Sequence, residues 1–139
     1  MLDPRVGKED ALDRGARTPL NLTARGRLGE QMAASFLTER GYRVLARNQH
    51  TPLGELDLVC RDHAEMVIVE VKSRSGALYG SALEAIGPLK ARRLRSAAVW
   101  WLSSHGLFPC PMRFDAVVVD LDAQGMPCCL QHVRDLLGA

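Results

Sequence analysis

The chain has 139 residues, and its 18 basic and 16 acidic residues leave a net charge of +2. This length excludes a large multidomain assembly. A composition of 47% apolar and 24% charged residues is that of a soluble globular domain, and it excludes disorder over the whole chain. The charge is unevenly distributed: it is +3 over residues 1–47, −2 over 48–90 and +1 over 91–139. An acidic middle therefore lies between two basic flanks.

The N-terminal segment and the cysteines restrict the cellular setting. Residues 1–22 lack the apolar run of a signal peptide, so we expect a flexible leader before a single domain over 23–139. The longest apolar run, 97–102, is far shorter than the ~20 residues that cross a bilayer. The four cysteines form no C-x-x-C pair, which predicts reduced thiols in a cytoplasmic protein. Cys128, Cys129 and His132 match no standard zinc spacing, so we do not assign a zinc site there.

Apolar residues at helical spacing predict a first amphipathic helix from Thr23 to Gly41, where glycine can end it in a left-handed conformation. Glu30 falls about 20° from Leu37 on a helical wheel, so it flanks the buried stripe. A short strand is expected over 42–46, and Pro52 and Gly54 predict a turn over 48–54.

The middle of the chain predicts two paired strands. Over 55–60 the residues alternate, so that Glu55 and Asp57 share one face while Leu56, Leu58 and Cys60 share the other. A polar loop over 61–65 leads to a strand over 66–72 that is apolar on both faces until Glu70 and Lys72, which is typical of a central strand. A loop is expected over 73–80.

The last part of the chain predicts a helix that begins at Pro88 and ends at Gly106, then a buried strand over 113–120 and an edge segment through Val133. Lys90 lies on the inner stripe of this helix, one turn before Leu94. Short loops make the first three strands an antiparallel meander, and the long helix can serve as a crossover to a parallel strand. The element order is thus α-β-β-β-α-β-β, and the fold class is α/β with a mixed sheet and flanking helices.

Hairpin pairing of the two central strands would gather Glu55, Asp57, Glu70 and Lys72 on one side of the sheet, with Glu30 close by on the first helix. Two like charges 4 Å apart repel by ~4 kcal/mol at an effective dielectric constant of ~20. Three such pairs approach the ~5–15 kcal/mol stability of a whole domain, so the cluster needs compensation. Protonation, the lysine or a hard divalent cation such as Mg²⁺ or Mn²⁺ can supply it.

These residues resemble the metal site of the PD-(D/E)XK nuclease superfamily, in which an Asp on one strand and an E-x-K on the next hold Mg²⁺. Asp57, Glu70 and Lys72 match that pattern, whereas the superfamily's proline before the aspartate is replaced by Leu56. Several short motifs occur in the same order as in the YraN-like family of bacterial proteins, which are predicted endonucleases with a restriction-endonuclease-like fold. The motifs are Gly29-Glu30, Gly41-Tyr42, Asn48, Gly54 to Val59, Val69 to Arg74, Gly80, Lys90 and Arg113 to Asp115.

The resemblance implies a role for each matching residue. Asp57 and Glu70 would hold one or two Mg²⁺ or Mn²⁺ ions, assisted by the Val71 carbonyl, and Lys72 would position the attacking water. Glu30 would add a helix carboxylate to the site, although an exposed helix glutamate is an equal alternative. The remaining candidates for contact with substrate are Glu55, Arg74 and Lys90.

The function that this resemblance implies is Mg²⁺-dependent hydrolysis of phosphodiester bonds in DNA, including branched or damaged DNA. The expected partner is nucleic acid and not a membrane. Both a monomer and a homodimer are compatible with the sequence. One alternative is a nucleic-acid-binding module on the same fold without catalysis, and another is a structural interaction protein. The intact acidic and lysine set favours the enzyme, because a site without function has no evident reason to retain a repulsive cluster.

Overall fold

The fold is described by a computed structural model over residues 22–75 and 87–137, and structural statements below concern these residues. The elements in chain order are α2 (Leu22–Glu39), β1 (Arg43–Thr51), β2 (Gly54–Asp62), β3 (Glu65–Ser75), α3 (Pro88–Ser104), β4 (Met112–Leu121) and β5 (Pro127–Val133). The predicted leader lies outside the described residues, apart from Leu22, which begins α2. Neither α2 nor α3 combines the length and hydropathy that a bilayer-spanning helix requires.

The five described strands form one sheet in the order β1-β2-β3-β4-β5. Antiparallel pairing joins β1 to β2, β2 to β3 and β4 to β5, whereas β3 and β4 are parallel. The connection between the two parallel strands contains α3, as the crossover rule requires. The expectation of an α/β fold with a mixed sheet is confirmed.

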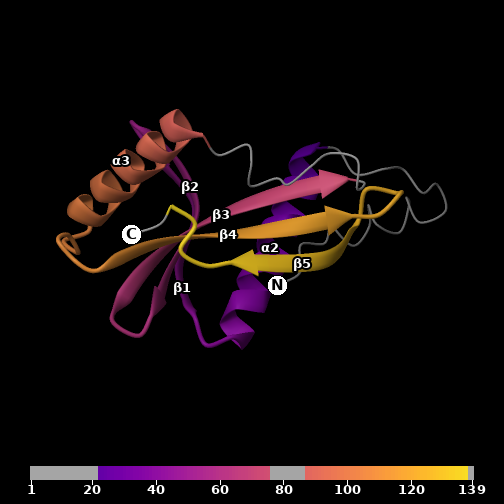
Figure 1. Ribbon diagram of the computed structural model, residues 1–139, viewed down its shortest axis with the longest axis horizontal. Coiled ribbons are helices and arrows are strands. Elements are labelled where there is room, and N and C mark those ends of the chain that lie inside the picture. The colour runs from indigo at the N-terminus through magenta and orange to yellow at the C-terminus, as the bar shows by residue number, and fades with distance from the viewer. Residues whose placement is uncertain (1–21, 76–86, 138–139) are drawn as a thin grey trace, which may run out of the picture.

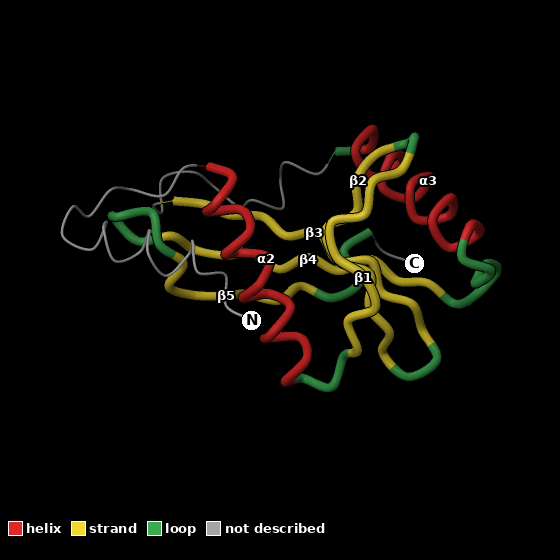
Figure 2. Tube along the Cα trace, turned by 180° about the vertical axis from the view of Figure 1, so that it is seen from behind, coloured by secondary structure: helices red, strands yellow, loops and turns green. Residues whose placement is uncertain are grey.

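The two helices cover opposite faces of the sheet, because successive residues of a central strand point to opposite sides. On β3, Val67 and Val69 belong to the apolar cluster beneath α2, whereas Met66 and Ile68 belong to the cluster beneath α3. Figure 1 shows α3 beside β2 at one end of the sheet, and Figure 2 shows α2 crossing over β3, β4 and β5 from the other side.

A close approach at Gly29 fixes the height of α2 above the sheet. A Cβ atom at this position would lie 3.4 Å from the Ser73 Oγ and 3.8 Å from a methyl carbon of Val119. The helix therefore rests directly on the ends of β3 and β4. Glu30, the next residue along α2, is thereby held at the level of the sheet.

The sheet divides between β2 and β3, and we call this region the fork. The last backbone pair between the two strands is Leu58 with Val69. Beyond it, β2 continues to Gly54 paired only with β1, and β3 continues to Ser75 paired only with β4. Figure 2 shows the β1–β2 hairpin running across the direction of β3, β4 and β5. Asp57 and Glu70, which lie directly beyond this last pair, are therefore at the point where the two strands separate.

Three details of the predicted strands are wrong. The first strand does not end at residue 46 but runs to Thr51, because exposed polar residues still pair with β2. The loop expected over 73–80 does not begin at Ser73, because β3 stays paired with β4 to Ser75, and residues 76–80 lie outside the described residues. Leu56 does not share a face with Leu58: it packs in the cluster beneath α3, because β2 turns away from β3 at the fork.

Candidate functional site

Asp57 and Val71 meet across the fork. The Val71 N–H donates a hydrogen bond to Asp57 Oδ2 at 2.8 Å. In a regular antiparallel ladder this N–H would bond the backbone of β2, which has diverged here, so the aspartate side chain takes that place. The carbonyl of a strand residue points to the same side as its N–H, so the Val71 oxygen also faces the fork.

Glu70 is the most buried acid of the predicted cluster, with 6% of its surface exposed. One of its carboxylate oxygens, Oε2, lies 3.2 Å from Lys72 Nζ and 3.3 Å from Lys90 Nζ. Lys72 comes from the same strand, whereas Lys90 comes from the first turn of α3. Two of the three lysines of the chain therefore converge on a single carboxylate oxygen.

Asp57 has an unusual proton affinity. Burial, followed by the negative charge of Glu70, raises the pKa of Asp57 to about 7, against the hydrogen bond from Val71. Burial is the larger of these two causes, and the repulsion from Glu70 exceeds the opposing attraction of Lys72. A divalent cation placed here would favour the ionised form.

Glu30 approaches the same cluster from α2. Burial raises the pKa of Glu30, the Asn48 side chain opposes this by a hydrogen bond, and the charges of Glu55 and Glu70 add to the rise. Asn48 lies opposite Asp57 in the β1–β2 pairing, between the pairs formed by its two neighbours. Its φ of 50° is one that asparagine tolerates better than most residues.

Asn48 is thus a member of the site that pattern reasoning did not assign. Its place among the family motifs is the one signal that could have identified it, because an exposed asparagine before a turn is otherwise unremarkable. The side chain lies close enough to Glu30 on α2 to lower its pKa, and it belongs to the strand pair that carries Asp57.

Two predicted residues do not join this cluster. Glu55 is exposed near the hairpin tip, where its Oε2 lies 2.9 Å from His50 Nδ1. Arg74 forms an ion pair with Asp120, its neighbour on β4. The structure therefore brings together Asp57, Glu70, Lys72 and Lys90, with Glu30 within electrostatic reach.

A second polar cluster is buried on the α2 side of the sheet. Asp115, which is fully buried, accepts hydrogen bonds from the Arg113 guanidinium at 2.9 and 3.0 Å and from the Tyr42 hydroxyl at 3.2 Å. His132 Nε2 adds a further contact at 2.9 Å. Burial alone would raise the pKa of Asp115, but the hydrogen bonds from His132 and Arg113 hold it well below its usual range.

This second cluster gives a structural role to residues of two family motifs, Gly41-Tyr42 and Arg113 to Asp115. Arg113 also forms ion pairs with Asp62 and Glu65, so it connects β4 to the turn between β2 and β3.

The residues considered for a zinc site are not arranged as one: Cys128 and Cys129 are exposed, whereas His132 contacts Asp115. Over residues 22–75 and 87–137, no three His, Cys, Asp or Glu side chains are arranged to hold a metal ion by themselves. A metal at the fork would therefore depend on fewer side chains and on backbone or water oxygens.

Comparison with known proteins identifies the family. The model of "Uncharacterised protein family UPF0102" matches residues 29–119, a span that contains the whole fork. A UPF0102 protein of Renibacterium salmoninarum is 48% identical over 120 residues, which cover 86% of this chain and 98% of the relative. A UPF0102 protein of Anaeromyxobacter dehalogenans is 50% identical over 96 residues, covering 69% and 72%, and one of Frankia alni is 45% identical over 111 residues, covering 80% and 92%. The chain therefore belongs to the UPF0102 family, the YraN-like proteins that its motifs resemble.

Proposed function

We propose that the protein is a divalent-metal-dependent nuclease with a restriction-endonuclease-like fold that hydrolyses phosphodiester bonds in DNA. The observation that carries this proposal is the meeting of Asp57 with Glu70, Val71 and Lys72 at the fork between β2 and β3. The arrangement of a mixed sheet between two helices supports the fold assignment.

The oxygen donors at the fork suit Mg²⁺ or Mn²⁺. Mg²⁺ usually binds one or two carboxylates and keeps several waters, which agrees with a site of two carboxylates and a carbonyl. Asp57 and Glu70 would hold the ion together with the Val71 oxygen. Glu30 is not arranged as a third side-chain ligand, so it would contribute through its nearby charge. When bound, the ion would neutralise charge on the phosphate and lower the pKa of a water molecule. Burial is the largest cause of the raised pKa of Asp57, and the negative charges of Glu70 and Glu30 add to it; a cation would offset these two charges.

The lysines have distinct tasks in the proposed reaction. Lys72 is half-buried, and its ammonium forms an ion pair with Glu70, which restricts its position. From there it would orient the attacking water and stabilise the negative charge that develops on the phosphate. Lys90 is more exposed, and it would leave Glu70 to contact a substrate phosphate.

Charge on α3 gives independent support for a nucleic-acid substrate. The helix carries Lys90, Arg92, Arg93 and Arg95 and no acidic residue. All four lie in its N-terminal half. Lys90 pairs with Glu70, whereas the three arginines are exposed, so this part of the helix presents positive charge that would suit a polyanionic ligand.

Cleavage of defined DNA tests the proposal. Labelled single-stranded, duplex, flap and four-way-junction DNA are incubated with purified protein in Mg²⁺, Mn²⁺ or EDTA. We expect metal-dependent cleavage of at least one substrate, and loss of at least 100-fold in rate in Asp57→Asn and Glu70→Gln, about 3 kcal/mol of barrier. Glu39→Gln, an exposed carboxylate at the far end of α2, is the control. Cleavage that persists in both fork variants would overturn the proposal.

Binding measurements separate the proposal from a non-catalytic nucleic-acid-binding module. The module predicts salt-sensitive DNA binding that needs no metal and is retained in Lys72→Ala, without any cleavage. The nuclease predicts that Lys72→Ala binds DNA and metal but cleaves slowly.

A further inference from the structure

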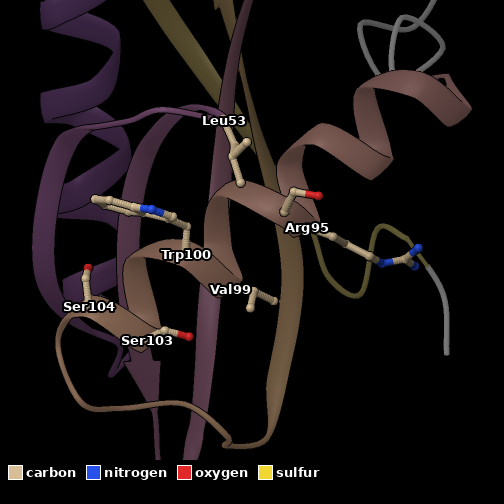
Figure 3. Close-up of a pocket in the computed structure, with 7 residues that line it drawn as sticks. Leu53, Arg95, Val99, Trp100, Ser103 and Ser104 are labelled. Atoms are coloured by element: carbon tan, nitrogen blue, oxygen red, sulfur yellow. The ribbon is translucent and has the colours of Figure 1, made fainter.

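The outer side of α3 carries a surface groove at the tip of the β1–β2 hairpin, shown in Figure 3. The hairpin rests on the helix here, since a Cβ at Gly54 would lie 3.8 Å from Ala97 Cβ. The groove has a volume of about 730 Å³ and is lined by Leu53, Val99 and Trp100, with Arg95 and three serines around them. Trp100 and Arg95 extend to different sides of Val99 in this view.

Trp100 is the feature of this groove that needs an explanation. It is 40% exposed, whereas its neighbour Trp101 is 5% exposed, stacks on His105 and donates to Gln49. Trp100 has no aromatic partner among the described residues. Leu53, across the groove, is 48% exposed, so the two side chains together present apolar surface to solvent. Such a patch is typical of a binding surface.

The charge around the patch identifies the kind of occupant. Arg92, Arg93 and Arg95 are exposed on α3, and none of them forms an ion pair with another described residue. A second copy of the chain that used the same face would bring two such arrays together and would be repelled. A polyanion with flat apolar groups suits both the arginines and the indole, and a single DNA strand has this chemistry.

We propose that an unpaired DNA strand binds in this groove, with a base stacked on Trp100 and a phosphate held by Arg95. A duplex offers its phosphates but keeps its bases stacked inside, so the indole would add nothing to duplex binding. Trp100 lies ten residues after Lys90, about 15 Å along the helix, which is the length of about four stacked nucleotides. Resting on the proposed nuclease function, this assigns the substrate class as DNA with unpaired nucleotides beside the cleaved bond.

Equilibrium binding without cleavage tests the groove directly. The Asp57→Asn protein is titrated in EDTA against a fluorescein-labelled oligothymidylate and against a duplex of equal length, and anisotropy is measured. We expect Trp100→Ala to weaken binding of the single strand about 5- to 150-fold and to leave duplex affinity within about 2-fold. Trp100→Phe should lose less, because it keeps an aromatic plane. Met126→Ala, which removes an equally exposed apolar side chain elsewhere, should have no effect.

Intrinsic fluorescence gives a second readout, since the chain contains only two tryptophans. In Trp101→Phe the groove residue is the sole tryptophan, and oligothymidylate should quench its emission. In Trp100→Phe the remaining tryptophan is buried and should not respond. Arg95→Gln should reduce the slope of log affinity against log salt by about 0.7 for the single strand.

The inference is overturned if Trp100→Ala leaves single-strand affinity unchanged, or if it weakens single-strand and duplex binding equally. These outcomes are distinct from failure of the nuclease proposal. If cleavage depends on Asp57 but DNA binding does not depend on Trp100, only the groove proposal fails. If single-strand binding depends on Trp100 but no substrate is cleaved, only the nuclease proposal fails.

Discussion

Lys90 on α3 reaches Glu70 on β3: its Nζ lies 3.3 Å from the same carboxylate oxygen that Lys72 Nζ contacts at 3.2 Å. The contact joins the crossover helix to the strand that precedes it. Glu70 is nearly buried, whereas the Lys90 side chain is 45% exposed. The lysine can therefore exchange the carboxylate for another anion at small cost, while Glu70 always needs a cation.

Lys90→Met should change metal binding and DNA binding in opposite directions. A divalent ion at Glu70 competes with the lysines, so loss of one ammonium should tighten Mn²⁺ binding. We expect a gain of only about 5-fold, because solvent screens the charge of the partly exposed Lys90 ammonium. Loss of a phosphate contact should weaken DNA binding. Calorimetric titration with Mn²⁺ and anisotropy with DNA measure the two effects. Arg93→Met removes the same charge from the same helix, and an equal gain in Mn²⁺ affinity there would contradict the specific role of Lys90.

Mn²⁺ should stabilise the wild-type protein through the fork. A ligand present at 100 times its Kd adds ~2.7 kcal/mol to stability, which raises Tm by roughly 5–10 °C in a domain of this size. Asp57→Asn should show little of this shift, because it lacks one of the two carboxylates, while Glu39→Gln should match wild type. Differential scanning fluorimetry with and without EDTA provides the measurement. Equal shifts in wild type and Asp57→Asn would show that Mn²⁺ binds elsewhere.

The metal-free protein should lose stability as pH rises through neutrality. Burial and Glu70 raise the pKa of Asp57 to about 7 in the folded state, above the value of about 3.9 expected in the unfolded chain. The contribution of this protonated carboxyl is therefore fully present below about pH 4 and is lost as pH rises through about 7, amounting to at most ~4 kcal/mol.

Urea unfolding in EDTA across this pH range checks the effect. Asp57→Asn stays neutral, so its stability relative to wild type should increase from about pH 4 to about pH 8. A difference that does not depend on pH would mean that Asp57 titrates normally.

The apolar patterns of the sequence predicted the interior of the fold well. The predicted buried strand β4 is buried from Arg113 to Val119, including its apolar run Ala116 to Val119, and the helix that begins at Pro88 packs through the predicted stripe. Gly41 and Gly106 end their helices with φ values of +96° and +71°. These features depend on local periodicity, which a single sequence contains.

The fork could not be predicted, because it depends on where β2 and β3 stop pairing with each other and continue paired only with β1 and β4. Strict alternation placed Leu56 beside Leu58, but divergence of β2 from β3 changes its face. The ion-pair partner of Arg74 could not be predicted either, because Asp120 becomes its neighbour only through the parallel pairing of β3 with β4. Spacing was informative for Lys90, because the helical wheel already placed it on the inner stripe. Its contact with Glu70 required the crossover geometry.

Asp115→Asn should destabilise the fold without acting on the fork directly. The change leaves the Arg113 guanidinium buried and without its main counter-charge, for which ~3–5 kcal/mol is typical. Urea unfolding at neutral pH measures the loss. Asp122→Asn, a turn residue, should cost less than ~2 kcal/mol, and a similar cost for both changes would contradict the structural role of the Arg113–Asp115 pair.

Gly29 should tolerate alanine but not leucine. An added Cβ meets Ser73 and Val119 at ordinary contact distances of 3.4 and 3.8 Å, and alanine favours the helix by up to ~1 kcal/mol over glycine. A leucine side chain would have to lift α2 from β3 and β4, at a cost of roughly 1–3 kcal/mol. Because Glu30 moves with the helix, Gly29→Leu should also weaken Mn²⁺ binding, whereas Gly29→Ala should not. Urea unfolding and Mn²⁺ titration of the two variants test this, and a Gly29→Leu protein as stable as wild type would show that α2 does not rest on the sheet at this point.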